Sequence, residues 1–355
     1  MDPVLLFING LPPKVDIPPE LWPVVLGFTF VIGLVIGSFL NVVGLRFLAE
    51  ESITLPPSSC PHCKARIRPQ DNIPVISYIL LGGRCRDCKA GISIQYPLIE
   101  LATGVLFTLV VWFFGVSLTS LFLLFMVANL IVIFITDLRE SFIFQINSLS
   151  LIPAGLIYNA FSLGPIQGST ALNLGAMIIH VPDGLISALI AIAIAFAFFE
   201  GMILLSMLVF GTDGFGHGDT HLMMGAGAFL GWPLTVLALV LGFIAQTIPA
   251  IPMLVIQWIQ NKQWTSLISG AAALVFGTLP IFTMSLGFSL EIRTAISLLC
   301  IVLTLVALIV FLKQVRTSQS FTYLPLGPAL VIGILVALFW GQPIIAYYQV
   351  LMQAR

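Results

Sequence analysis

The stretch Leu185-Ile-Ser-Ala-Leu-Ile-Ala-Ile-Ala-Ile-Ala-Phe-Ala-Phe-Phe199 contains no charged side chain, and Leu298–Leu312 is equally free of charge. A helix that crosses the hydrocarbon core of a bilayer, which is about 30 Å thick, must present such a surface. The whole chain agrees with this pattern, because only 8% of its 355 residues are charged and 59% are hydrophobic. We therefore predict an all-α polytopic membrane protein that contacts the lipid bilayer.

The overall charge and composition exclude two other classes of protein. A net charge of −1 gives no indication of a nucleic-acid partner. The small number of charges and the excess of apolar residues also exclude intrinsic disorder.

The basic residues are concentrated in one segment. Seven of the fourteen lie between Arg46 and Lys89, and loops with an excess of Lys and Arg face the cytoplasm. We therefore predict that this loop is cytoplasmic and that the N-terminus lies outside. Residues 1–21 lack the basic region and cleavage site of a signal peptide, so the first span is expected to stay attached. Ten transmembrane helices are expected, near 22–45, 97–116, 118–137, 142–161, 183–210, 220–237, 240–260, 265–287, 292–313 and 324–348.

Four cysteines in the basic loop form two pairs. Cys60-Pro-His-Cys63 and Cys85-Arg-Asp-Cys88 are separated by 21 residues, close to the spacing of four-cysteine zinc sites. Two disulfides are the alternative, but a cytoplasmic loop is in a reducing compartment, which favours structural zinc. His62 is interpreted as a solvated neighbour of the site, and Cys300, alone in an apolar helix, as a small core residue. The predicted zinc ligands are Cys60, Cys63, Cys85 and Cys88.

Two aspartates lie at the expected cytoplasmic ends of helices. Asp137 ends an apolar run that starts at Asn129, and Asp219 follows Gly214-Phe-Gly-His-Gly218. If the two carboxyl groups meet, one can keep a proton and act as general acid while the other activates water. The alternative remains open that Asp219 only caps a helix and Asp137 only marks an interface. Glu100, Glu200 and Asp213 are interpreted as structural or interfacial.

These residues, taken in order, resemble the type IV prepilin peptidases, also called prepilin leader peptidase/N-methyltransferases. The resemblance covers residues 27–232 and 310–345. It rests on Gly37-Ser-Phe-Leu-Asn-Val-Val43 with Arg46, the first cysteine pair, Asn72-Ile-Pro74, Gly83-Arg-Cys-Arg-Asp-Cys88, Ile92-Ser93, Tyr96-Pro-Leu-Ile-Glu100, Asp137, Gly216-His-Gly-Asp219 and Leu324-Pro-Leu-Gly-Pro328.

The resemblance implies a multi-pass enzyme of the bacterial inner membrane. It would be an aspartic endopeptidase that removes the leader of type IV prepilins or pseudopilins after a glycine, on the cytoplasmic side, in pilus assembly or protein secretion. The family commonly also methylates the new N-terminus with S-adenosylmethionine. Carried over to this sequence, Asp137 and Asp219 are the catalytic pair and the four cysteines bind zinc. Gly216, Gly218 and His221 belong to the motif around Asp219.

The sequence departs from the family pattern at three places. Phe144-Gln145 stands where a Pro-Asp pair is usual, and His221 stands where lysine is usual. If that lysine tunes the two aspartates or holds substrate, His221 would make the activity more pH-dependent. Residues 241–312 are expected to add two helices to the usual eight. The expected organisation is an external segment at 1–21, a first helix at 22–46, a cytoplasmic zinc-binding loop at 47–96, a peptidase core at 97–240, inserted helices at 241–312 and a C-terminal helix region at 313–355.

Two other functions remain as alternatives. A presenilin-like intramembrane protease would share only the short Gly-x-Gly-Asp motif, and the cysteine loop has no place in it. A cation-coupled transporter would bind its ion with membrane carboxylates. Such a carrier would place them near mid-helix, whereas Asp137 and Asp219 are expected at helix ends.

Overall fold

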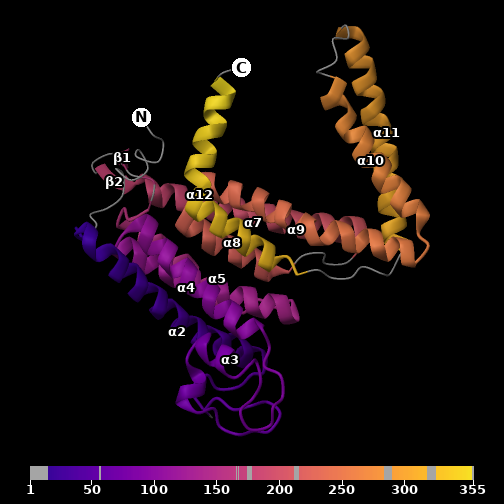
Figure 1. Ribbon diagram of the computed structural model, residues 1–355. Coiled ribbons are helices and arrows are strands. Elements are labelled where there is room, and N and C mark those ends of the chain that lie inside the picture. Colours follow the sequence, from indigo (N-terminus) through magenta and orange to yellow (C-terminus); the bar gives the residue numbers. More distant parts are fainter. Residues whose placement is uncertain are drawn as a thin grey trace. The chain divides into compact units, whose positions relative to one another are not determined.

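The computed structural model describes residues 15–55, 57–164, 166, 168–173, 178–211, 216–283, 290–317 and 325–353, and it is predominantly helical (Figure 1). The one sheet in these residues is an antiparallel pair of strands, in which Ser169 lies opposite Pro182. The elements are η1 (Pro19–Leu21), α2 (Trp22–Leu48), η2 (Pro69–Asn72), α3 (Ile76–Leu80), α4 (Gln95–Phe114), α5 (Leu118–Glu140), α6 (Gln145–Ala160), β1 (Ser169–Asn173), β2 (Ile178–Pro182), α7 (Asp183–Phe210), α8 (His217–Leu230), α9 (Trp232–Gln260), α10 (Trp264–Thr283), α11 (Leu290–Thr317) and α12 (Gly327–Gln353).

Within the described residues, six helices are long and apolar enough to cross a membrane: α2, α4, α5, α7, α9 and α12. The prediction of a helical, polytopic membrane protein is confirmed. α6 has 16 residues and α8 has 14, fewer than the roughly 20 that a spanning helix needs. α10 and α11 contain shorter apolar stretches, Trp264–Phe276 and Ile296–Ala307.

The helix boundary expected between 220–237 and 240–260 is wrong. α8 ends at Leu230, and α9 runs without interruption from Trp232 to Gln260. Gly231 separates the two helices with a φ of 74°, a left-handed conformation that glycine adopts without steric cost. Pro233 then stands at the start of α9, where its missing N–H costs nothing. The signals that end α8 and begin α9 therefore both lie at positions 231–233, and no residue near 239 breaks α9.

The chain divides into two compact units, residues 1–245 with 325–355 and residues 246–324. In the second unit, α10 packs against α11. Cys300 on α11 is 3% exposed, which confirms its prediction as a core residue.

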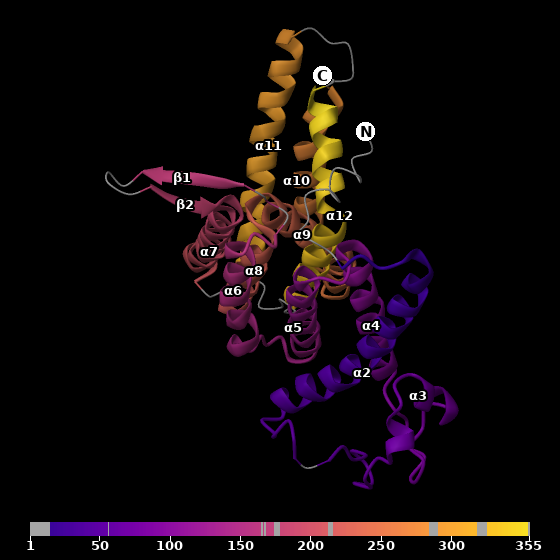
Figure 2. The same cartoon turned by 90° about the vertical axis from the view of Figure 1, so that its left-hand side faces the viewer.

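In the first unit, α5 is the central helix of the core. It contacts α2, α4, α6 and α12, and Leu123, Met126, Leu130 and Ile133 on it are completely buried. Figure 1 shows α2, α4 and α5 side by side. The loop between α2 and α4, which contains α3, extends beyond the ends of these helices (Figure 2). Asp137 lies near the end of the central helix.

Candidate active site and cysteine cluster

The two aspartates occupy the last turn of α5 and the first turn of α8. Asp137 is 4% exposed and Asp219 is 6% exposed. They are close enough for the charge of Asp137 to act on Asp219. α6 and α12 each pack against both α5 and α8. These shared neighbours, together with the close approach of Ile143 after α5 to Gly218 in the first turn of α8, place the end of α5 beside the start of α8. Two carboxyl groups that are far apart in the sequence therefore lie in one environment.

Asp137 is held by the start of α12. The backbone N–H of Gly327 donates a hydrogen bond of 2.8 Å to Oδ2 of Asp137. Gly327 is the first residue of α12, where backbone N–H groups have no partner within the helix and attract negative charge. A Cβ at position 327 would lie 2.5 Å from Oδ2 of Asp137. Only glycine therefore lets the backbone come this close to the carboxyl group.

Gly218 allows a second close approach. A Cβ at this position would lie 2.8 Å from the Cβ of Ile143, which belongs to the connection between α5 and α6. Gly216 precedes α8 in an extended conformation. The Gly-x-Gly-Asp motif thus packs the first turn of α8 against the segment that follows Asp137.

Polar side chains from α7 and α8 lie around the first turn of α8. Nδ1 of His217 lies 3.1 Å from Oε1 of Glu200, and Thr220 donates to the same oxygen over 3.5 Å. Glu200 therefore links α7 to the turn that contains Asp219. His221 is half-buried, and its Nδ1 has no hydrogen-bond partner among the described residues.

The remaining acidic candidates have different surroundings. Glu100 is buried in α4, and its Oε2 accepts the backbone N–H of Val75 over 2.7 Å. This bond attaches the loop to the helices, which supports a structural role. Asp213 lies outside the described residues.

The four loop cysteines form one cluster. Their Sγ atoms all lie within 4.8 Å of one another, Cys60 and Cys88 are 3.8 Å apart, and all four thiols are free. Zn–S bonds of about 2.3 Å in a tetrahedron separate the sulfur atoms by about 3.8 Å. The cluster therefore has the donor atoms and the spacing to bind a metal ion.

The two cysteine pairs adopt the same backbone turn. In each, the N–H of the first cysteine bonds to the carbonyl group five residues further on. The lysine after the second cysteine has a positive φ, 60° at Lys64 and 61° at Lys89. The sequence repeats Cys-Lys-Ala at these places, a signal of the shared turn that sequence reasoning missed.

The thiols of the cluster favour a cation between them. Hydrogen bonds from the backbone N–H of Cys63 and of His62 lower the pKa of Cys60 to about 6. The backbone N–H of Ala65 also favours ionisation of Cys63, but desolvation and the neighbouring sulfur atoms outweigh it, so the pKa of Cys63 is raised to about 11. A second thiolate beside the first is unfavourable, and a divalent cation removes that repulsion.

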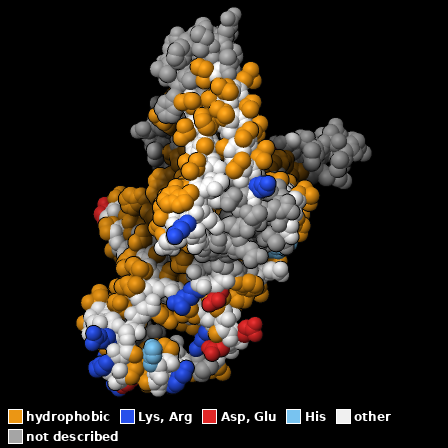
Figure 3. Space-filling view, turned by 90° about the vertical axis from the view of Figure 1, so that its right-hand side faces the viewer, with side chains coloured by type: hydrophobic (Ala, Val, Ile, Leu, Met, Phe, Trp, Pro, Cys, Tyr) orange, Lys and Arg blue, Asp and Glu red, His pale blue; other side chains and the backbone are white. Residues whose placement is uncertain are grey.

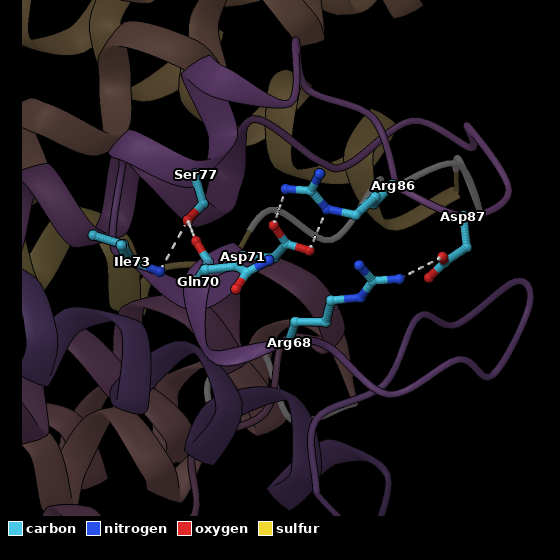
Figure 4. A network of polar contacts seen from close by, with 7 residues as sticks. All are labelled: Arg68, Gln70, Asp71, Ile73, Ser77, Arg86 and Asp87. Carbon is cyan, nitrogen blue, oxygen red and sulfur yellow. Dashed lines mark hydrogen bonds and ion pairs between the residues drawn. The ribbon is translucent and has the colours of Figure 1, made fainter.

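Polar contacts hold the two halves of the loop together (Figure 4). The guanidinium of Arg86, between the two cysteines of the second pair, donates to both carboxylate oxygens of Asp71, at 2.8 and 2.5 Å. Arg68 and Asp87 form a longer ion pair of 3.6 Å with both side chains exposed. The bidentate pair fixes η2 against the second cysteine pair.

We expect Asp71→Asn to make the loop more susceptible to protease than Asp87→Asn, its matched control. The hydrogen bonds from Arg86 hold the pKa of Asp71 below its ordinary value. The ionised carboxylate therefore stabilises the folded loop above the pKa of unfolded Asp71, and this contribution is lost as the pH falls through the lower folded value. Limited proteolysis at pH 7 with mass analysis of the fragments measures the effect. Equal cleavage of the two variants would contradict it.

Comparisons with known proteins identify the family. The chain matches the family models described as bacterial Peptidase A24 N-terminal domain, over residues 31–114, and type IV leader peptidase family, over residues 124–251. The prepilin leader peptidase/N-methyltransferase of Pseudomonas aeruginosa is 32% identical over 249 residues, which cover 64% of this chain and 80% of the relative. The chain belongs to the type IV leader peptidase family.

Other curated relatives extend this similarity. The prepilin leader peptidase/N-methyltransferase of Neisseria gonorrhoeae is 36% identical over 226 residues, which cover 57% of this chain and 72% of the relative. The prepilin leader peptidase/N-methyltransferase of Stutzerimonas stutzeri is 29% identical over 341 residues, which cover 90% of this chain and 91% of the relative. No solved structure matches the chain.

The family matches contain most of the candidate site of this type IV leader peptidase. Both aspartates and all four cysteines lie within the matched segments, whereas Gly327 lies beyond them. Sequence reasoning noted the motif Leu324-Pro-Leu-Gly-Pro328 but gave Gly327 no role. The available signal was a glycine followed by proline at the start of a helix.

One departure from the family pattern has a visible packing role. Phe144 packs against Phe47, near the end of α2, with ring centroids 5.1 Å apart, and Gln145 begins α6. The aromatic pair holds the end of α2 against the connection that follows Asp137.

Proposed function

We propose that this chain is an aspartic endopeptidase that removes the leader of type IV prepilins or pseudopilins after a glycine, with Asp137 and Asp219 as its catalytic pair. The observation that carries the proposal is the burial of the two carboxyl groups in one environment, at the ends of two helices. Two carboxyl groups that share one environment resist joint ionisation, so one keeps its proton. The protonated group can donate to the scissile carbonyl while the other activates water.

The position of the aspartates favours a peptidase over a carrier. Asp137 lies three residues before the end of α5, and Asp219 is the third residue of α8. A substrate segment next to the membrane surface can reach helix ends, whereas ion sites of carriers are expected near the bilayer midplane.

The proposal also assigns the side of the membrane on which the site lies and the way the chain crosses the bilayer. The basic loop indicates that the site faces the cytoplasm of a bacterial inner membrane. The N-terminus would then lie outside, because α2 leads from it to this loop, and two additional helices within 241–312 would preserve the orientation of α12. Prepilins or pseudopilins and the bilayer are then the partners.

We assign a structural zinc ion to the cysteine cluster. The four sulfur atoms occupy all the positions of a tetrahedral ion, so no position is left for a catalytic water. The ion would instead hold together a polar loop that has little hydrophobic core of its own.

We also propose an N-methyltransferase activity that uses S-adenosylmethionine, because the similar proteins carry that name. The bound donor supplies an activated methyl group. We assign this activity to the cysteine loop, the polar element that leads into α4, because Gln95 at the start of α4 accepts a hydrogen bond of 2.9 Å from Arg139 near the end of α5.

The direct test is co-expression of the protein with a candidate prepilin. Leader removal is scored by the mass of the pilin, and methylation by transfer of isotope from labelled S-adenosylmethionine. An unprocessed prepilin at full expression of the wild-type protein would contradict the proposed peptidase for that substrate class.

We expect Gly327→Ala to reduce the kcat of leader removal by about 10- to 100-fold, because the new Cβ displaces Asp137 from its productive position. The displacement follows from the 2.5 Å between that Cβ and Oδ2. Gly201→Ala is the matched control, since a Cβ there meets no atom within 4 Å. The initial rates of leader removal by the two purified variants are compared, and equal rates would show that Gly327 does not position Asp137.

A further inference from the structure

One cavity lies between α2 and the loop that follows it, and a second cavity adjoins it within that loop. One has a volume of about 350 Å³, and α2 contributes Val35, Phe39 and Arg46 to it. The other has about 660 Å³ and includes Arg66 and Arg68. The two share Pro57, Ser58 and Asn72 as lining residues. Together they form a continuous site outside the region of the two aspartates.

The site lies on the side of α2 that faces away from the helical core. Successive residues of a helix are rotated by about 100°, which places Val35, Phe39 and Arg46 on one face. Gly37 and Gly44 lie on the opposite face, where added Cβ atoms would meet α4 and α5. The cavities therefore do not open into the contact between α2 and the core.

The site lies at the level of one membrane surface. Phe39 follows Trp22, the first residue of α2, by about 26 Å along the helix axis, close to the thickness of a bilayer core. Val35 is 54% exposed and Phe39 is 52% exposed, so both side chains are accessible to acyl chains. Arg46 lies about two turns further along α2, at headgroup level. Lys and Arg side chains gather at the bottom of Figure 3, the end of the molecule that carries this loop.

The charges in the lining are all positive. Arg46, Arg66 and Arg68 line the cavities, and no carboxylate does, although Arg68 also forms the exposed ion pair of 3.6 Å with Asp87. The Arg46 guanidinium donates to the carbonyls of Ser52 and Ile53. Hydroxyl and amide groups, among them Ser58 and Asn72, complete the polar end, while Val35, Phe39 and Val42 of α2 form an apolar wall. A lining with arginines at one end and apolar side chains at the other fits a ligand in which an anionic group is attached to a hydrocarbon chain.

We propose that these cavities bind an anionic phospholipid of the leaflet next to the loop, with its phosphate among the arginines and its acyl chains along Val35 and Phe39. A basic leader peptide would meet like charges there, and so would the sulfonium of S-adenosylmethionine. A soluble anion would leave the apolar wall unused. The inference is independent of the peptidase activity and goes beyond it.

Native mass spectrometry of the purified full chain tests the proposal, with phosphatidylglycerol and phosphatidylcholine of identical acyl chains as probes. We expect wild-type protein to retain phosphatidylglycerol preferentially. Arg66→Gln should weaken this retention about fivefold, the effect of one basic side chain near an anionic surface, and Arg66→Lys should largely restore it. Arg84→Gln, a loop arginine that lines neither cavity, is the matched control. Arg66 is preferred to Arg46 for substitution because the bonds of Arg46 also shape the loop.

Four results would overturn the proposal: no preference for phosphatidylglycerol in the wild type, equal effects of Arg66→Gln and Arg84→Gln, displacement of the lipid by glycerol phosphate at equal concentration, or displacement by S-adenosylmethionine. The third would assign the site to a soluble anion, and the fourth to the methyl donor. Because the readout is lipid retention, failure of the lipid site leaves the peptidase proposal untouched, and failure of the peptidase leaves the lipid site untouched.

Discussion

Asp137→Asn and Asp219→Asn should each abolish leader removal, a loss of about 10³-fold or more. An amide can neither activate water nor share a proton with the other carboxyl group, while its size is nearly that of the carboxyl group. In Asp137→Asn, the amide oxygen can still accept the N–H of Gly327, so the hydrogen bond that fixes α12 is retained. The protein should therefore remain inserted and folded. Mass analysis of a co-expressed prepilin measures cleavage.

Asp183→Asn provides the control for this pair. Asp183 also lies in the first turn of a helix, but about 25 Å along α7 from Glu200, the residue that contacts the start of α8. Its carboxylate accepts a hydrogen bond from Thr170 over 2.6 Å. We expect this variant to cleave normally. Full cleavage by either Asn variant at 137 or 219 would remove that aspartate from the catalytic pair.

Cys85→Ser combined with Cys88→Ser should lower the zinc content from about one ion per chain to nearly none, because two thiolates no longer hold a tetrahedral ion. The loop should then be cleaved by added protease. We expect methylation to be lost and leader removal to fall only severalfold, since the proposed catalytic aspartates lie on helices α5 and α8 rather than in the loop. Metal analysis, isotope transfer and leader removal are measured on the same samples.

Cys300→Ala is the control for loss of a thiol, because Cys300 lies on α11 and is not a member of the four-cysteine cluster. It should keep its zinc and both activities. Equal loss of cleavage and methylation in the double variant would contradict the assignment of methylation, but not of cleavage, to the cysteine loop. A metal-free wild-type protein with a protease-resistant loop would contradict the zinc assignment.

The sequence by itself determined the membrane class, the position of most helices, the cysteine cluster and the family. Each of these features depends on residues that are close together in the sequence. A membrane-spanning helix must satisfy its own backbone hydrogen bonds, so a long apolar run specifies a helix without reference to the rest of the chain. The two Cys-x₂-Cys turns likewise depend on a few neighbouring residues, and their repetition predicts a cluster that could bind one metal ion.

Only the tertiary structure decided which helix ends meet. Gly327 donates to Asp137 across 190 positions of sequence, and α6 and α12 bring α8 beside α5. No periodicity in the sequence predicts these contacts, because the lipid-facing and protein-facing sides of such helices are both apolar. A soluble helix shows its buried side by an alternation of polar and apolar residues. Here that alternation is missing, and close packing at small residues such as Gly218 and Gly327 selects the partners instead.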